Sequence, residues 1–176
     1  MRNLPRRHHA GFTMMEVLVS IVIITVGLLG IAGLQALSLR STAGAGLRTV
    51  ATQLAYDMTD RMRANSEGVG VGAYDINASP ASVSTCYSSG CTFQQVAQQD
   101  MQTWLSRVQT LLPDGQAIIC RDGSDPENAT SATAAGSCDN DPKAPYYVKI
   151  FWKEVNDETV GAAAVQERVF VTAFMP

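Results

Sequence analysis

The sequence predicts an α+β fold in which a long N-terminal helix precedes a small head containing a second helix and an antiparallel sheet of about three strands. Two periodic patterns carry this prediction. Apolar residues run almost unbroken over 12–39 and then recur at helical spacing over 40–65, which predicts one long helix. The remaining segment, 66–176, carries a second helical pattern and several alternating ones, so it is expected to form the head.

Residues 12–39 are apolar enough and long enough to cross a membrane. The only strongly polar side chains in this run are Glu16 and Gln35, and about 20 largely apolar residues span the hydrocarbon core of a bilayer. Basic residues precede the run and none follows it before Arg40, a bias that keeps the N-terminus in the cytoplasm. A secretory signal cleaved after Ala45 is the alternative, but its apolar core would span only about 7–15 residues.

The second half of the predicted long helix is amphipathic. Its apolar stripe consists of Leu47, Val50, Ala51, Leu54, Met58 and Met62. The charged residues between them lie mostly off the stripe, as expected for a solvated face. Asn65 and the glycine-rich run SEGVGVG are expected to end the helix and to begin an irregular loop that continues through Gly90.

The head is expected to contain a helix over 93–112 and strands near 116–121, 146–153 and 166–174. Thr92 and Gln95 have the spacing of a capping box, and Pro113-Asp114-Gly115 supplies a stop. The helical stripe comprises Phe93, Val96, Ala97, Met101, Trp104, Leu105, Val108, Leu111 and Leu112. Trp104 and Trp152 lie on apolar stripes and are expected in the core, whereas Lys149 and Lys153 share a strand face that we expect to be solvated.

Four cysteines allow three pairings. We favour Cys86 with Cys91 and Cys120 with Cys138, because each pair closes a local loop. The second pair would tether a long polar insertion over 122–144, which would otherwise be unusual in a compact domain. Paired thiols fit an exported head, since disulfides persist outside the cytosol.

Neither the motifs nor the charge indicate an enzyme or a nucleic-acid-binding protein. The sequence lacks the residue spacings typical of a catalytic nucleophile, a phosphate-binding loop or a zinc site, and no cofactor is expected. The chain is acidic, with 13 basic against 16 acidic side chains. Carboxylates do gather in the polar insertion, at Asp122, Asp125, Glu127, Asp139 and Asp141. They lack the spacing and turn glycine of a calcium-binding EF-hand, so a solvated loop without metal is the expectation.

The segment AGFTMMEVLVS resembles the class III signal of type IV prepilins. In that family a prepilin peptidase cuts after the glycine and methylates the new N-terminal residue, which implies a leader at 1–11, cleavage between Gly11 and Phe12, and N-methylation of Phe12. Cleavage would also remove Arg2, Arg6 and Arg7, leaving 10 basic side chains against 16 acidic ones. The segments GLLGIAGLQ and DMTDRMRAN further resemble the PilV group of minor pilins, and the order of elements resembles the pilin-like fold.

The resemblance implies a role for Glu16. A carboxylate within a bilayer costs a few kcal/mol, about 2.5–3.5 at the centre on insertion scales and less near an interface. In the family this glutamate meets the N-terminal charge of a neighbouring subunit, which would favour transfer of the helix from lipid into the filament. The alternative is a carboxylate at the lipid interface without such a role.

The resemblance also implies a minor type IV pilin, stored in the bacterial inner membrane as a single-pass protein with a periplasmic head. Its partners would be prepilin peptidase, other minor pilins, the major pilin and a tip adhesin. It would prime pilus assembly and occupy the pilus tip, with adhesion, twitching motility and DNA uptake as open roles. The alternatives are a minor pseudopilin of a type II secretion system and a single-pass membrane-anchored ligand-binding module.

Overall fold

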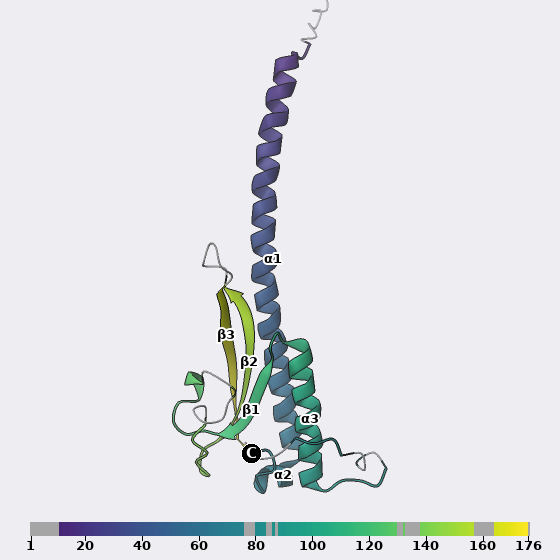
Figure 1. The fold of residues 1–176 in the computed structure, drawn as a ribbon, viewed down its shortest axis with the longest axis vertical. Coiled ribbons are helices and arrows are strands. Elements are labelled where there is room, and N and C mark those ends of the chain that lie inside the picture. Colours follow the sequence, from purple (N-terminus) through teal and green to yellow (C-terminus); the bar gives the residue numbers. More distant parts are fainter. Residues whose placement is uncertain are drawn as a thin grey trace, which may run out of the picture. The chain divides into compact units, whose positions relative to one another are not determined.

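The computed structural model describes residues 11–75, 80–83, 86, 88–129, 132, 138–156 and 164–175. The chain divides into two compact units, Met1–Ala43 and Gly44–Pro176. Helix α1, Met14–Ala64, contributes residues to both (Figure 1). The basic residues of the expected leader lie outside the described residues.

In the first unit, α1 carries apolar side chains on all of its faces. Every side chain described between residues 11 and 43 is exposed. An 18-residue window of the helix has a mean hydropathy of 2.7 and buries none of its surface. By length and composition α1 can therefore cross a membrane, and a helix that is apolar all round is expected to be covered by lipid or by other helices.

Among the described residues, the second unit combines the rest of α1 with two further helices, the 3₁₀ turn η2 and a sheet. The elements are α2 (Ser66–Gly70), α3 (Phe93–Leu111), β1 (Gln116–Arg121), η2 (Pro126–Asn128), β2 (Tyr146–Asn156) and β3 (Ala164–Phe174). The sheet has the order β1-β2-β3 and both pairings are antiparallel. The predicted fold class, a long N-terminal helix followed by a small α+β head, is confirmed.

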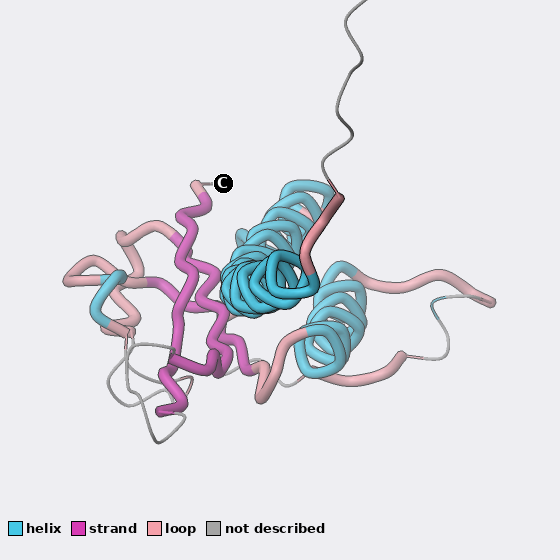
Figure 2. The backbone as a smooth tube through the Cα atoms, turned by 90° about the horizontal axis from the view of Figure 1, so that it is seen from above, coloured by secondary structure: helices cyan, strands magenta, loops and turns pink. Residues whose placement is uncertain are grey.

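The main core lies where one face of the sheet meets α1 and α3 (Figure 2). From α1 it takes Ala51, Leu54, Ala55, Met58 and Met62. The expected α1 stripe is therefore largely correct, with Leu47 and Val50 packed at its margin. Both tryptophans are buried as expected, Trp104 to 1% and Trp152 to 2% exposure.

Helix α3 begins at the expected capping box. Thr92 accepts a hydrogen bond from the Gln95 amide at 3.3 Å, and the Gln95 side chain accepts one from the Thr92 amide at 3.0 Å. This exchange satisfies two of the amides that a helix start leaves without partners. One member of the predicted stripe is wrong, because Leu111 is 48% exposed.

The glycine-rich segment after Asn65 is more ordered than the sequence predicts. It forms the short helix α2, and the Asn65 side chain caps it by accepting from the Gly68 amide. The Asn65 side chain also donates to the Phe93 carbonyl at 2.8 Å, and the Tyr146 hydroxyl donates to the Val69 carbonyl at 3.3 Å. These contacts to α3 and β2 offset the low helix propensity of glycine.

Candidate functional site

The expected processing site lies just before the first residue of α1. Gly11, Phe12 and Thr13 have no regular secondary structure, and the Phe12 side chain is 81% exposed. Because α1 begins only at Met14, the Gly11–Phe12 peptide bond lies outside the helical hydrogen-bond ladder.

Thr13 caps α1 and Glu16 occupies the third helical position. The Thr13 hydroxyl accepts a hydrogen bond from the Glu16 amide at 3.3 Å, and the Thr13 carbonyl accepts from the Glu16 and Val17 amides at 3.1 and 3.3 Å. A carboxylate in the first turn interacts favourably with the helix dipole, by about 0.3–1 kcal/mol at exposed sites. The Thr-x-x-Glu spacing is a helix-capping signal that the sequence already shows. Glu16 thus helps to stabilise the first turn of α1, in addition to any role in assembly.

The Glu16 carboxylate has no cationic partner within the described part of the chain. The Ser20 hydroxyl, one turn further along α1, donates to the Glu16 main-chain carbonyl at 2.7 Å and leaves the side chain untouched.

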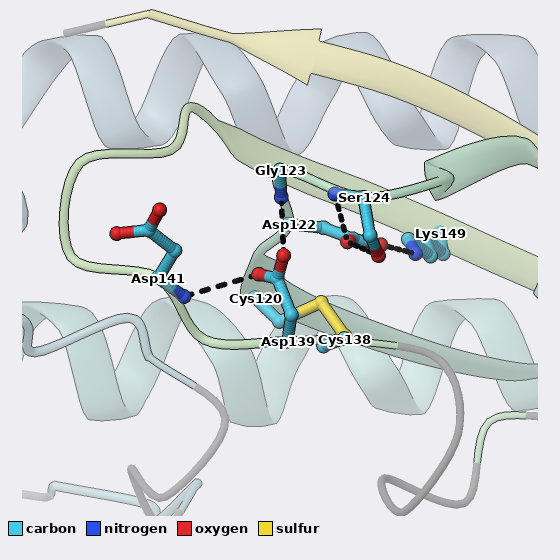
Figure 3. The surroundings of a disulfide bond; sticks show 8 residues. All are labelled: Cys120, Asp122, Gly123, Ser124, Cys138, Asp139, Asp141 and Lys149. Carbon is cyan, nitrogen blue, oxygen red and sulfur yellow. Dashed lines mark hydrogen bonds and ion pairs between the residues drawn. A yellow bond between two sulfur atoms is a disulfide. The ribbon is translucent and has the colours of Figure 1, made fainter.

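A second candidate site lies on the opposite face of the sheet from the helices (Figure 2). Here the loop between β1 and β2 covers a small cluster made of Ile118, Ala129 and Phe151. Disulfide Cys120–Cys138 ties the loop to β1, and the shorter Cys86–Cys91 disulfide precedes α3, so both favoured pairings occur. Figure 3 shows the first of these bonds beside three aspartates of the loop.

Asp122 and Lys149 form an ion pair beneath this loop. The Lys149 ammonium lies 2.6 Å from an Asp122 carboxylate oxygen, and the two side chains are 0% and 2% exposed. Ser124 donates to the other carboxylate oxygen through its amide at 3.2 Å and its hydroxyl at 3.0 Å. Burial by itself raises the pKa of Asp122, but the hydrogen bonds from Lys149 and Ser124 outweigh it and hold the pKa below its ordinary value.

The solvated positions predicted for Lys149 and Asp122 are therefore wrong. Alternation along β2 places Lys149 on the face away from the helices, as expected, but the disulfide-tethered loop covers that face. The sequence signal that could have found the pair is a lysine on the same strand face as Phe151, next to an insertion held by a cysteine pair. Lys153, on the same face, is exposed as expected and pairs with Asp114 at 2.5 Å.

Two other carboxylates of the loop, Asp139 and Asp141, accept hydrogen bonds from its backbone. Asp139 accepts from the Gly123 and Asp141 amides, each at 3.0 Å (Figure 3). Asp141 accepts from the Lys143 amide at 2.9 Å. Among the residues described, no group of three or more acidic, histidine or cysteine side chains is arranged to hold a metal ion.

Comparison with known proteins gives two matches along the N-terminal part of the chain. Residues 6–32 match the prokaryotic N-terminal methylation motif, and residues 33–102 match the family described as type IV pilin Tt1218. Over residues 6–102 the chain is therefore similar to type IV pilins. No curated protein and no solved structure matches it.

The matched methylation motif includes the Gly11–Phe12 bond and Glu16. Such a motif implies processing by prepilin peptidase and assembly with other pilins. The family match extends through α1 and α2 to the middle of α3 and does not include the sheet. The disulfide-tethered loop and the strands thus lie beyond both matches.

In the head, ion pairs connect α1 to α3. Arg61 on α1 donates to Asp100 on α3 at 3.0 Å, and Arg107 on α3 donates to Asp57 on α1 at 2.8 Å. Asp100 also accepts from the Tyr74 hydroxyl at 3.0 Å. The charged residues expected to be solvated on α1 therefore include two that bridge helices, a pairing that periodicity along one helix does not reveal.

Proposed function

We propose that this chain is a minor type IV pilin: a subunit processed at Gly11–Phe12, N-methylated on Phe12, and incorporated with other minor pilins to prime the filament and occupy its tip. The observation that carries the proposal is the N-terminal methylation motif over residues 6–32, which includes the start of α1 and part of its exposed apolar run. The PilV-like segments favour a minor subunit, and the long loop with the two disulfides favours a pilin over a pseudopilin of a type II secretion system.

The role of Glu16 follows from charge. Cleavage before Phe12 creates an amine at the start of the mature chain, while Glu16 has no cation near it in the described residues of its own chain. A neighbouring subunit's amine would neutralise it, whereas an unpaired carboxylate in lipid costs energy. The partners are accordingly prepilin peptidase, other minor pilins and the major pilin. Before assembly the chain is held in the inner membrane, with its N-terminus in the cytoplasm and its head in the periplasm.

The first test is the intact mass and N-terminal sequence of the membrane-extracted chain, expressed with and without a prepilin peptidase. We expect a peptidase-dependent chain that begins at methylated Phe12. A chain that begins at Met1 in both cells, or after Ala45, would contradict the proposal.

The second test separates processing from assembly. Glu16→Ala should still be cleaved, because the scissile bond precedes α1, but it should be at least about tenfold depleted from sheared filaments and remain in the membrane fraction. Ser20→Ala, one turn further on, is the matched control and should assemble as the wild type does. Incorporation of Glu16→Ala at the wild-type level would contradict the proposed neutralisation of Glu16 by a neighbouring subunit's amine. Co-purification with filament subunits rather than with a secretion complex distinguishes a pilin from a pseudopilin.

A further inference from the structure

The two edges of the sheet differ in length and in what lies beside them. Strand β1, Gln116–Arg121, is short, and its middle residues line a pocket of about 250 Å³ together with α3 residues Met101 and Trp104. Strand β3, Ala164–Phe174, forms the other edge and is 11 residues long. Strands of about 5–6 residues are the most common, so β3 is a long edge.

The outer side of β3 makes no main-chain hydrogen bonds within the described part of the chain. Strand β3 pairs with β2 residue by residue and without a bulge, from Phe174 opposite Tyr146 to Ala164 opposite Asn156. No further backbone hydrogen bond involves β3 among the described residues. A regular row of unpaired amides and carbonyls is a template for another extended chain.

Proteins usually protect such edges with proline, lysine, a bulge or uncompensated charge. Strand β3 contains no proline or lysine. Its two charged residues are balanced inside the sheet, because Arg168 pairs with Glu154 at 3.0 Å and Glu167 lies opposite Lys153 in the register. The edge therefore presents neither a structural obstacle nor a net charge to an approaching strand.

The middle of β3 is also incompletely covered. Residues 168–172, which include the apolar run Val169–Phe170–Val171, are only partly buried, and Val165 is 58% exposed. A strand added at this edge would cover apolar surface on both faces of the sheet, since successive side chains of β3 point to opposite faces. The chemistry that fits is thus an extended segment with apolar residues on both of its faces.

We propose that the outer edge of β3 binds an extended strand of another pilin subunit, so that the sheet continues from one head into the next. The inference rests on assembly of this chain with other pilins and names the surface of the head that makes the contact. Main-chain hydrogen bonds would supply the pairing, and the partly buried valines and Phe170 would select an apolar strand.

The test places lysines on the edge at two exposed positions. Val165→Lys with Ala173→Lys adds the protection that β3 lacks, while both side chains are exposed and the fold should be retained. The matched control is Val71→Lys with Leu111→Lys, which adds the same charge at positions that are 58% and 48% exposed, one just after α2 and one on α3. Circular dichroism and thermal unfolding of each purified full-length chain verify folding.

The readout is the amount of each chain in sheared filaments relative to the membrane fraction. We expect the β3 variant to fall at least tenfold while the control stays at the wild-type level. Photo-cross-linking from p-benzoylphenylalanine at position 165 should yield an adduct with a pilin, and the same probe at position 71 should not. The inference would be overturned if a folded β3 variant entered filaments at the wild-type level, or if position 165 cross-linked to a protein other than a pilin. Either result would leave the proposed function intact. Absence of the wild-type chain from filaments would instead overturn the proposed function, and the inference with it.

Discussion

The Lys149 ammonium and the Asp122 carboxylate lie 2.6 Å apart beneath the disulfide-tethered loop, with no more than 2% of either side chain exposed. One residue comes from the central strand and the other from the start of the loop. The pair therefore joins the sheet to a segment that the amino-acid sequence alone presents as a polar surface insertion.

Removing one member of this pair should destabilise the head strongly. Lys149→Ala or Asp122→Ala leaves a buried charge without its partner, and the expected loss in the free energy of unfolding is about 3–5 kcal/mol. The double variant Asp122→Leu, Lys149→Met removes both charges and should lose far less. Urea unfolding in detergent, followed by tryptophan fluorescence, measures each loss. A double variant as unstable as the single ones would show that the loop geometry, rather than the charge, is responsible.

The same pair predicts a dependence of stability on pH. Because the pKa of Asp122 is lower in the folded chain than its ordinary value of 3.8, the stabilisation is fully present above that value and is lost as the pH falls through the folded pKa. The difference in unfolding free energy between the wild type and Asp122→Asn should thus be constant near neutral pH and shrink below about pH 4. A difference that grows on acidification would contradict the sign of this shift.

The two core tryptophans should respond differently to replacement by phenylalanine. The Trp104 indole N–H donates to the Leu54 carbonyl of α1 at 2.8 Å, whereas the Trp152 indole N–H, also buried, has no hydrogen-bond partner among the described residues. Trp104→Phe leaves that carbonyl without the indole donor and should cost about 1–3 kcal/mol more than Trp152→Phe, which loses similar volume but no hydrogen bond. Thermal unfolding of both variants, followed by circular dichroism, tests the order; equal losses would assign the effect to volume alone.

The two disulfides should contribute unequally. Cys120 and Cys138 are 18 residues apart, and Cys86 and Cys91 are 5 apart. The chain-entropy relation gives about 3 kcal/mol for the longer loop and about 2 for the shorter one. Replacing Cys120 and Cys138 by serine should therefore lower the urea midpoint more than replacing Cys86 and Cys91. The reverse order would mean that the short loop supports structure beyond its own closure.

Elements of this chain whose physical cause is local can be predicted from the amino-acid sequence. The apolar run through Leu39, the stripe from Ala51 to Met62 and the capping box at Thr92 each depend on residues a few positions apart, and each occurs in the structure. The methylation motif is equally local and is matched independently over residues 6–32. Alternation also predicts which side of β2 each side chain takes.

What covers each side of the sheet depends on packing between distant segments. The sequence predicts a solvated Lys149 because alternation gives the face of a residue but not the neighbours of that face, and here the covering loop is held by a disulfide between residues 18 apart. The glycines after Asn65 form α2 because contacts from Asn65 and Tyr146 compensate for weak propensity. The free edge of β3 is likewise a consequence of strand order, which follows from packing across the head and not from the periodicity of any one strand.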